Sequence, residues 1–435
     1  MNIWDPTWET ADRSILEARQ MELLCEQVRR ATDRLPYFQA KMRAAQLRLS
    51  DIKSLDDLRR LPFTVKQDFM DNYPYGMMAV PLREVLRVHG SSGTTRGKAT
   101  IAGYTRRDLD IWAELCARLA TAAGVTSSDV AQICFGYGLF TGGFGLHCGL
   151  ERVGALVLPI SSGNTPRQVQ FMRDFGTTAL VGTPTYAVHI GEVAREQGVA
   201  REHLSLQWGL FGGEPWTEGI RRQIESLLGI QATDNYGLSE LCGPGISYEC
   251  LNKNGMHIAE DHFLVEVLDP KTNEPVPEGT VGELVFTALT REATPLIRYR
   301  TGDLASLTHE RCPCGRTLAR MSKVVGRSDD MIVVRGVNVF PSQIESILLD
   351  IEHTQPHYQI VLKKRGALDH LEVRVEVTEE IFNDEMKKLR AVEEEIRAKL
   401  RVGLGLDVDV RLVEPKSIER STGKAKRVFD ERPKE

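Results

Sequence analysis

Apolar positions near the start of the chain recur with the period of an α-helix. The positions i, i+3, i+7 and i+10 of this pattern are Met21, Leu24, Val28 and Ala31. Side chains at this spacing fall on one face of a helix, because the helical repeat is about 3.6 residues. The N-terminal segment is therefore predicted to form an amphipathic helix.

From about residue 85 to 240, short apolar runs alternate with helical segments. The runs at 179–181 and 208–211 read Ala-Leu-Val and Trp-Gly-Leu-Phe, which is typical of buried parallel strands between crossover helices. One intervening helix is predicted to begin after the N-cap residue Thr217 and to end at Gly229. Its inward positions are Ile220, Ile224 and Leu227. The bulk of the chain is thus expected to have an α/β fold.

The pattern changes after Gly326. The predicted elements are, in order, a strand at 331–334, a helix from about 342, strands at 359–362 and 371–377, a charged helix over roughly 381–400, and a strand with alternating Leu406, Val408, Val410 and Leu412. This β-α-β-β-α-β order predicts a small α+β domain of about one hundred residues. We divide the chain into an N-terminal domain over 1–326, a connecting segment over 327–330 and a C-terminal domain over 331–435; the family resemblance given below implies that the segment is a hinge and the C-terminal domain mobile.

Length and charge narrow the class of protein. The chain has 435 residues, and because single hydrophobic cores stop growing at ~250–300 residues, at least two domains are expected. The formal net charge of -5 provides no positive field for nucleic acid or an anionic membrane, which favours a small-molecule substrate. No basic-then-apolar leader and no run of ~18 apolar residues occurs. We expect a cytoplasmic protein that binds neither nucleic acid nor membranes.

A strand over 85–89 runs into a loop rich in glycine and hydroxyl groups over residues 90–100. Loops of this kind wrap phosphate groups with backbone N–H groups. The loop is not a Walker A motif, because Ser92 stands where the first glycine belongs and Ala99 where Ser or Thr belongs. A flexible hairpin turn is the structural alternative.

Two further segments carry carboxylates at expected turns. In the segment 234–240, Glu240 could hold Mg²⁺ and Tyr236 could stack on a base. In the segment 299–304, Asp303 could accept both hydroxyls of a ribose. Taken alone, each segment is equally compatible with a turn that bears a solvated acid.

The order of the segments carries more information than any one of them. The three described above are followed by 326–330, 334–338 and 421–427, and all six together resemble the core motifs of the acyl-adenylate-forming superfamily. Four stretches look like phenylacetate-CoA ligases in particular, namely 136–143, 213–216, 298–303 and 339–345. The resemblance spans about residues 4–427. It implies an enzyme that uses ATP to join an aryl acid, phenylacetate first, to AMP and then to CoA, with release of AMP and pyrophosphate.

The resemblance also implies a nucleotide-binding role for particular residues. The β- and γ-phosphates would be held by Ser91, Ser92, Gly93, Thr94, Thr95, Gly97 and Lys98. Mg²⁺ would be held by Glu240, with the hydroxyl of Ser239 in the same motif. The adenine would be framed by Glu214, Pro215, Asp234 and Tyr236, and the ribose hydroxyls would be bound by Asp303 and Arg327. Two residues depart from the family pattern: Arg96 looks like an extra residue in the loop, and Ala99 replaces the usual proline.

Further roles follow from the same resemblance. Lys424 would be the catalytic cation that reaches both the substrate carboxylate and the α-phosphate. Asp329 maps onto the hinge and Gly336 onto the loop that lines the CoA channel. The acyl pocket would involve Tyr137, Phe140, Thr141, Gly142, Gly143 and Phe144, although each aromatic side chain could equally be part of the core. The resemblance also suggests a homodimer.

Two other functions remain open. The acyl group could pass to a carrier-protein phosphopantetheine instead of free CoA, and the acid could be indoleacetate, hydroxyphenylacetate or a benzoate. A nucleotide-binding regulator without catalysis is the alternative from another class, but it would have little reason to keep both Glu240 and Lys424.

The cysteine pattern predicts a structural zinc ion. The eight cysteines are spread thinly, which in a cytosolic protein favours reduced thiols or metal ligands over disulfides. A Cys-x6-His and a Cys-x-Cys element could together supply four soft or borderline ligands without an open position. These ligands are Cys250, His257, Cys312 and Cys314. Because the spacing is not that of a standard zinc finger, four unconnected residues are the alternative.

Overall fold

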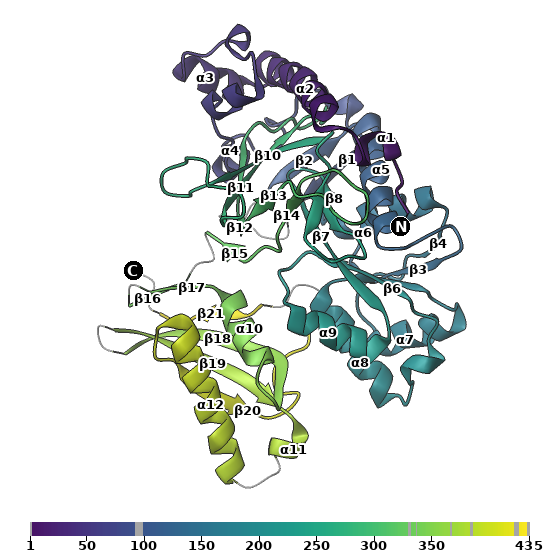
Figure 1. The fold of residues 1–435 in the computed structure, drawn as a ribbon, viewed down its shortest axis with the longest axis vertical. Helices are drawn as coiled ribbons and strands as arrows, with labels where there is room; N and C mark the ends of the chain where they lie inside the picture. The colour runs from purple at the N-terminus through teal and green to yellow at the C-terminus, as the bar shows by residue number, and fades with distance from the viewer. Residues whose placement is uncertain are drawn as a thin grey trace.

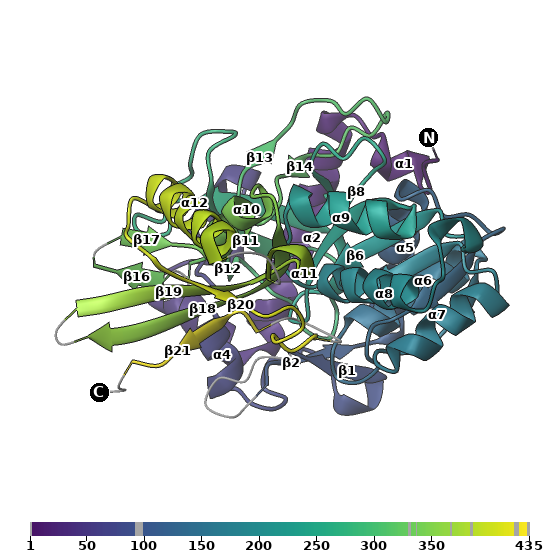
Figure 2. The same ribbon diagram turned by 90° about the horizontal axis from the view of Figure 1, so that it is seen from below.

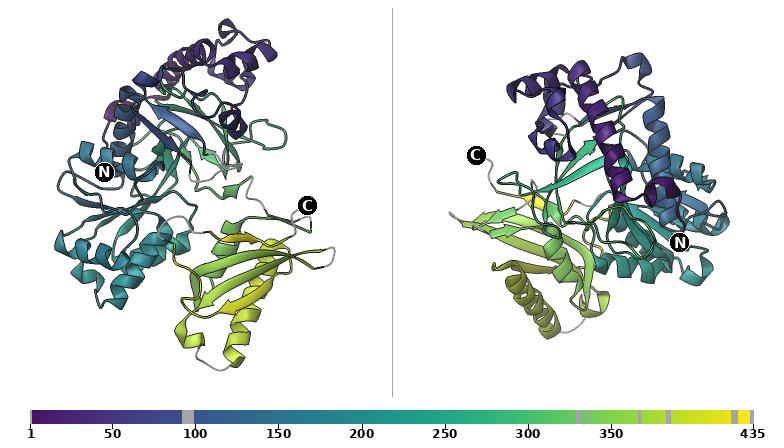
Figure 3. Two further views of the ribbon diagram at one scale, coloured as in Figure 1. Left: turned by 180° about the vertical axis from the view of Figure 1, so that it is seen from behind. Right: turned by 45° about the horizontal axis from the view of Figure 1, so that its top comes forward.

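The computed structural model has a large N-terminal domain and a smaller C-terminal domain (Figure 1). It describes residues 2–91, 99–328, 332–335, 337–365, 368–382, 386–421 and 426–432. Figure 1 shows the C-terminal domain, in green to yellow, beside the end of the N-terminal domain that carries helices α8 (Pro184–Glu196) and α9 (Glu218–Leu228). The first helices, in purple, lie at the end away from the C-terminal domain (Figure 3).

A nine-stranded sheet forms the centre of the N-terminal domain, in the order β13-β14-β9-β8-β7-β6-β5-β3-β4. The strands that pair in parallel are β3 (Val130–Ile133), β4 (Leu156–Leu158), β5 (Ala179–Gly182), β6 (Trp208–Gly212) and β7 (Gln231–Leu238). Antiparallel pairing continues through β8 (Gly243–Glu249), β9 (Met256–Ile258), β14 (Arg320–Met321) and β13 (Leu307–Thr308). The parallel strands predicted from the two apolar runs are confirmed as β5 and β6.

Helices cover both faces of this sheet. Successive side chains of a strand point to opposite faces, so each strand contacts both layers of helices. On β5, Ala179 and Val181 pack in an apolar cluster with α5 and α6, whereas Leu180 packs with α7, α8 and α9. The remaining helices of the two layers are α5 (Arg106–Ala122), α6 (Gly142–Val153) and α7 (Thr165–Asp174). This two-sided cover buries the central strands, including polar side chains such as Gln132 of β3 and Asn235 of β7.

Helix α9 follows its sequence signals closely. Thr217 caps its N-terminus with a side-chain hydrogen bond, and Gly229 ends it in the left-handed conformation, as predicted. One buried position differs from the prediction. The last turn buries Leu228, while Leu227 is half-buried.

A second, four-stranded antiparallel sheet has the order β10-β11-β12-β15. Its strands are β10 (Phe263–Leu268), β11 (Gly282–Ala288), β12 (Tyr299–Ala305) and β15 (Gly326–Arg327), and a separate hairpin is formed by β1 (Arg87–Gly90) and β2 (Ile101–Tyr104). One apolar cluster joins these strands to the large sheet. It includes Tyr104, Tyr236, Phe286 and Tyr299.

The N-terminal helices pack against the end of this region. They are α1 (Pro6–Glu9), α2 (Arg13–Arg34), α3 (Pro36–Ala44) and α4 (Lys66–Asp71), and short 3₁₀ turns occur at Leu49–Asp51, Leu55–Arg60, Leu82–Glu84 and Arg201–His203. The predicted amphipathic helix is confirmed as α2. Of its predicted apolar face, Leu24, Val28 and Ala31 are buried and Met21 is half-buried.

A buried ion pair ties the N-terminus to the segment after β13. The Glu9 carboxylate is wholly buried and accepts hydrogen bonds from the Arg316 guanidinium and from the Tyr248 hydroxyl, the latter at 3.0 Å. The backbone N–H of Thr317 donates to the carbonyl of Glu9 at 3.0 Å. Because Arg316 stands two residues after Cys314, these bonds fix the loop that carries this cysteine.

The C-terminal domain contains the predicted elements in the predicted order, with one different strand pairing. Its elements are β16 (Ile332–Val334), β17 (Val337–Val339), α10 (Pro341–Leu349), β18 (Thr354–Arg365), β19 (Leu368–Val377), α11 (Glu379–Phe382), α12 (Met386–Leu404), β20 (Asp409–Val413) and β21 (Val428–Asp430). The predicted helix over 381–400 comprises α11 and α12, and residues 383–385 lie outside the described part. Figure 2 shows α10 and α12 on the same face of the sheet β20-β19-β18-β21.

The different pairing concerns the first strand of this domain. The sequence predicts that it belongs to the same small domain sheet, but β16 pairs with β17 in a hairpin. Arg335 has a φ of 50°, so the chain turns back directly after β16. The place beside β18 is taken by β21, which runs parallel to it and was not predicted.

Among the described residues, the helices are all too short or too polar to cross a lipid bilayer.

Candidate active site

Two adjoining cavities open where the parallel strands β6 and β7 end, the position at which α/β sheets bind ligands. The larger cavity has a volume of about 560 Å³ and the smaller of about 130 Å³. Both are lined by Gly213, Asn235, Gly237, Leu238 and Arg327. A ligand in one cavity would therefore contact the same backbone as a ligand in the other.

Glu240 lies at the larger cavity, directly after β7. Its carboxylate accepts a hydrogen bond from the Thr100 hydroxyl at 2.8 Å. The hydroxyl of the adjacent Ser239 lies 3.3 Å from that of Thr141, which also lines the cavity. A buried carboxylate with hydroxyl groups around it can serve as an oxygen ligand for a hard cation such as Mg²⁺.

Asp303 joins three segments of the site. It accepts a hydrogen bond from the Tyr236 hydroxyl and one from the Arg327 guanidinium, each at 2.7 Å. Arg327 also donates to the carbonyl of Thr301 at 3.1 Å. Each carboxylate oxygen has a second lone pair, so Asp303 can still accept hydroxyl groups of a ligand. Asp303, Tyr236 and Arg327 all line the smaller cavity.

Tyr236 is held rigidly in the wall of the smaller cavity. Its ring stacks on Phe286, with centroids 6.0 Å apart and an interplanar angle of 26°. Burial, followed by the negative charge of Asp303, raises the pKa of Tyr236 well above its ordinary value. The hydroxyl therefore remains a proton donor to Asp303, and the ring keeps one orientation.

Asp234 lies in the same wall, close to a buried ion pair. Glu249 accepts two hydrogen bonds from Arg221 at 2.9 Å and one from the backbone N–H of Asp234 at 2.8 Å. Burial, followed by the charge of Glu249, raises the pKa of Asp234 to about 7. Near neutral pH this carboxyl group is thus partly protonated and can donate as well as accept a hydrogen bond.

Glu214 and Pro215 also line the smaller cavity, as their predicted role requires. The Glu214 carboxylate accepts a hydrogen bond from the backbone N–H of Thr185, in the first turn of α8, at 2.9 Å. The lining residues that were not predicted include Trp216 and Lys323. The tryptophan follows directly on Pro215 and could have been included, whereas nothing in the local sequence marks Lys323.

The predicted acyl-pocket residues divide into two sets. Phe140, Thr141 and Gly142 line the larger cavity, together with Phe135, which was not predicted. A Cβ atom on Gly142 would lie 2.7 Å from the Phe140 ring, so a larger residue there would displace this ring of the cavity wall. Phe135 directly follows the strand region of β3, and its place at the end of a parallel strand was the signal that could have found it.

The other three predicted acyl-pocket residues are absent from the described lining of the larger cavity. They are Tyr137, Gly143 and Phe144. The Tyr137 ring meets that of Phe144 edge to face, with centroids 5.1 Å apart, and its hydroxyl lies 3.0 Å from Nδ1 of His147. The Tyr137 ring is thus held by Phe144 and His147, and the acyl-pocket role of these three residues stays a prediction from the sequence.

Several predicted residues lie outside the described part of the chain. They are Ser92, Gly93, Thr94, Thr95, Gly97, Lys98, Asp329, Gly336 and Lys424. Neighbouring residues show where some of these segments start and end. Ser91 lines the larger cavity and Thr100 binds Glu240, so both ends of the predicted phosphate loop reach the same place. Ser421 and Lys426, on either side of Lys424, line a cavity of about 270 Å³ with Thr185 of the N-terminal domain.

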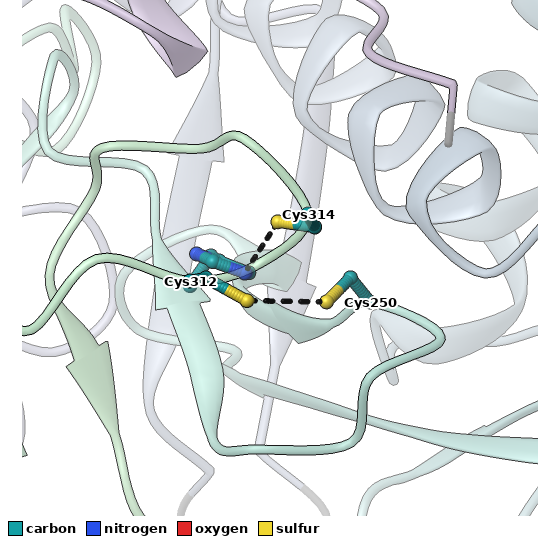
Figure 4. Close-up of side chains that lie close together, drawn as sticks. Cys250, Cys312 and Cys314 are labelled. Atoms are coloured by element: carbon teal, nitrogen blue, oxygen red, sulfur yellow. Dashed lines mark hydrogen bonds between the residues drawn. The ribbon is translucent and has the colours of Figure 1, made fainter.

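The four predicted zinc ligands lie together in one buried cluster. The ligand atoms of Cys250, His257, Cys312 and Cys314 are all within 4.8 Å of one another. The sulfur atoms of Cys250 and Cys312 are 3.7 Å apart, and Cys314 Sγ is 3.4 Å from His257 Nε2. Figure 4 shows the three cysteines converging from two separate segments. The fold therefore brings Cys250 and Cys312 together, although they are 62 residues apart in the sequence.

Comparison with known families defines the class of protein. Residues 92–288 match the family described as AMP-binding enzyme, and residues 336–432 match the AMP-binding enzyme C-terminal domain. Phenylacetate-coenzyme A ligase of Thermus thermophilus is 47% identical over 442 residues, with 98% of this chain and 99% of that protein covered. The enzyme of that name from Escherichia coli is 46% identical, with 97% and 96% covered. The chain belongs to the phenylacetate-coenzyme A ligase family.

Solved structures of one relative distinguish two overall arrangements. The structure of 2-hydroxyisobutyryl-CoA ligase in the postadenylation state, in complex with R3-HIB-AMP, has a TM-score of 0.93 at 31% identity and covers 99% of this chain and 92% of that chain. The same ligase in the thioesterification state, with 2-HIB-AMP and CoA, has a TM-score of 0.74 at the same coverage. Because the sequence identity and the coverage are nearly the same in the two comparisons, the lower TM-score reflects a different arrangement of the two domains. The present chain has the arrangement of the postadenylation state.

The raised pKa of Asp234 predicts a pH-dependent effect of its replacement by asparagine. The folded chain binds the carboxyl proton more tightly than the unfolded chain, so burial of Asp234 increasingly destabilises the fold as the pH rises from about 4 to about 7. Asparagine is neutral at every pH and has nearly the same shape. We expect the difference in the free energy of unfolding between Asp234→Asn and the natural chain to shift in favour of the variant by about 1 kcal/mol or more when the pH rises from 5 to 8.

Chemical denaturation followed by tryptophan fluorescence at the two pH values measures this difference. Asp269→Asn is the matched control, because Asp269 is an exposed aspartate whose pKa is lowered by hydrogen bonds from the backbone N–H groups of Lys271 and Thr272. If the variant instead lost stability relative to the natural chain when the pH rises from 5 to 8, the proposed protonation of Asp234 would be wrong.

Proposed function

We propose that this chain is an AMP-forming acid-CoA ligase that activates an aryl carboxylic acid, with phenylacetate as the first candidate. The observation that carries the proposal is the joined pair of cavities, in which Asp303 and Tyr236 line one cavity, Glu240 lines the other and Arg327 lines both. Relatives named phenylacetate-coenzyme A ligase match nearly the whole length of the chain, which supports the same chemistry here.

In the first half-reaction, a carboxylate oxygen of the acid attacks the α-phosphorus of ATP and the bond to pyrophosphate breaks. No general base is needed, because the nucleophile is already ionised. Asp303 and Arg327 would orient the ribose and Tyr236 the adenine, while the loop that starts at Ser91 would hold the outer phosphates. When bound beside Glu240, Mg²⁺ would supply positive charge against the phosphate oxygens.

Lys424 would complete the first half-reaction. The new bond brings the negative charges of a carboxylate and a phosphate together, and a fixed cation lowers the energy of that arrangement more than the energy of the separated reactants. The segments on either side of Lys424 line a cavity shared with the N-terminal domain. This placement of Ser421 and Lys426 supports the proposed role of Lys424 in adenylation.

In the second half-reaction, the sulfur of CoA attacks the acyl carbon and the bond to AMP breaks. We propose that the C-terminal domain, over 331–435, turns about a hinge at 327–330 between the two steps and that Asp329 absorbs the change of backbone angle. Gly336 would then line the CoA channel. The two arrangements of 2-hydroxyisobutyryl-CoA ligase support this movement.

The acid can be identified by measuring pyrophosphate release over a panel of phenylacetate, hydroxyphenylacetate, indoleacetate, benzoate and hexanoate, with and without CoA. Because Phe135 and Phe140 offer flat apolar walls at the larger cavity, we expect phenylacetate to exceed hexanoate in kcat/KM by about tenfold or more. A higher value for hexanoate would contradict the aryl substrate class. Activity that requires a carrier protein and ignores CoA would favour the alternative acceptor.

Replacement of Lys424 separates the two half-reactions. Lys424→Ala should slow adenylation by ~10²–10³, the usual loss when a preorganised charge-stabilising group is removed. Thioester formation from chemically made phenylacetyl-adenylate and CoA should be unchanged, because Lys424 would then have turned away from the acyl carbon. Lys426→Ala is the matched control two residues along the chain. An equal loss in both steps would contradict the domain alternation.

We also propose that Cys250, His257, Cys312 and Cys314 hold a structural Zn²⁺. Ligands at ~2.3 Å for sulfur and ~2.0 Å for nitrogen around a tetrahedral ion lie about 3.8 Å (S···S) and about 3.5 Å (S···N) apart. The separations in the structure, 3.7 Å and 3.4 Å, fit this geometry. All four side chains are buried, and four protein ligands leave no open position, which favours a structural over a catalytic ion.

Elemental analysis of protein purified without added metal should find about one zinc per chain. Cys314→Ser should lose the zinc and unfold at a lower temperature, because three remaining ligands hold the ion less tightly. Cys25→Ser, a half-buried cysteine of α2 outside the cluster, should change neither property. Metal-free protein with undiminished stability and activity would rule out this site.

The homodimer and the cytoplasmic location stay predictions from the sequence.

A further inference from the structure

One face of α8 forms a polar contact surface for the C-terminal domain. Its members, Thr185, His189, Glu192 and Glu196, stand at i, i+4, i+7 and i+11, so they lie along one side of the helix. Thr185 lines a cavity with residues of the C-terminal domain, and the other three line a second shared cavity of about 480 Å³. Three of these residues therefore surround a single interdomain space.

Glu192 makes the most extensive contacts on this face. Its Oε1 lies 3.1 Å from Nε2 of His357, and its Oε2 lies 3.8 Å from Nε of Arg420, both in the C-terminal domain. Within the N-terminal domain, Nδ1 of His189 is 3.9 Å from Oε2. Burial opposes the charge of Glu192, yet the His189 ring beside it, the hydrogen bond with His357 and the charges of His357 and Arg420 hold its pKa below its ordinary value.

Arg420 links Glu192 to the segment that carries Lys424. Its guanidinium donates two parallel hydrogen bonds of 2.7 Å to Glu376 on β19. The buried Glu376 carboxylate also accepts from the backbone N–H of Lys416 at 3.1 Å and of Ile418 at 2.7 Å. The chain is thus fixed up to Arg420, four residues before Lys424.

The far side of the same segment is fixed within the C-terminal domain. Arg427 lies 3.1 Å from the Glu345 carboxylate and its guanidinium lies 4.3 Å from the centre of the Tyr358 ring. Arg427 and Arg420 therefore bracket Lys424 on both sides. Of these two arginines, Arg420 also forms an ion pair with a carboxylate of α8, that of Glu192.

We propose that Glu192 is a positioning residue for adenylation: by binding His357 and Arg420, it holds the C-terminal domain where Lys424 reaches the nucleotide. The inference rests on the proposed function. The contacts of Glu192 with His357 and Arg420 exist only while the two domains are docked in this way, so their free energy favours this arrangement over the other. Glu192 acts through these residues and touches neither substrate.

A second ion pair on the same face provides the matched control. Glu196 lies 2.5 Å from Lys416 of the C-terminal domain, but the two side chains are 49% and 65% exposed. Exposed pairs of this kind contribute little to stability, whereas the Glu192 and Arg420 side chains are each only 17% exposed. Glu196→Gln should therefore leave both half-reactions unchanged.

The test compares Glu192→Gln with Glu196→Gln in the two half-reactions of the full chain. We expect Glu192→Gln to slow acid-dependent exchange of pyrophosphate into ATP by roughly 10- to 100-fold, because a hydrogen-bonded charge is removed from a buried contact. Formation of phenylacetyl-CoA from chemically made phenylacetyl-adenylate should remain within about twofold of the natural chain, because that step uses the other arrangement. An equal loss in both steps, or no loss in either, would overturn the proposal.

Hydrogen exchange provides a readout that does not depend on activity. In Glu192→Gln, the backbone amides of 416–421 and of α8 should exchange faster than in the natural chain and in Glu196→Gln, because the docked arrangement is less populated. Unchanged exchange would overturn the proposal even if adenylation is slowed. If the natural chain itself shows no acid-dependent pyrophosphate exchange, the proposed function fails, and the amide exchange still decides whether Glu192 holds the domains together.

Discussion

The Asp303 carboxylate binds Tyr236 of the large sheet and Arg327 of the small one, and the site is built around these two hydrogen bonds. All three side chains are partly or wholly buried, and bonds to an ionised group in such surroundings are stronger than bonds between neutral groups. They fix β7 against β12 and β15, and thereby the walls of both cavities. Arg327 also stands where the chain leaves the N-terminal domain, so the same bonds set the starting point of the C-terminal domain.

The contact between the domains combines close packing of two helices with polar contacts that water can replace. A Cβ atom on Gly219 of α9 would lie only 2.9 Å from Leu349 of α10, so the two helices approach closely at this point. Around α8 the contacts are ion pairs and hydrogen bonds of Glu192 and Glu196. Water can replace polar contacts at low cost when a domain turns away, whereas a large apolar interface would oppose the movement. This composition is in keeping with the proposed movement of the C-terminal domain between the two half-reactions.

Much of the candidate site could be predicted because its motifs are local. Tyr236, Glu240 and Asp303 belong to short segments whose order along the chain resembles a known superfamily, and the structure places all three at the joined cavities. Lys323 could not be found in this way, because no neighbouring residue marks it as part of a site. The predicted zinc ligands are an intermediate case: the residue types suggested a cluster, but only folding brings Cys250 to Cys312.

The sequence by itself determined the elements, since apolar periodicity and capping residues act within a few neighbouring positions. It predicted α2, β5, β6 and α9, and the change to an α+β domain after Gly326. The tertiary structure alone decided that β21 pairs with β18 and that α8 turns Glu192 toward the C-terminal domain. These features depend on which distant surfaces meet, and the free energy of such contacts is shared between segments that carry no common local pattern.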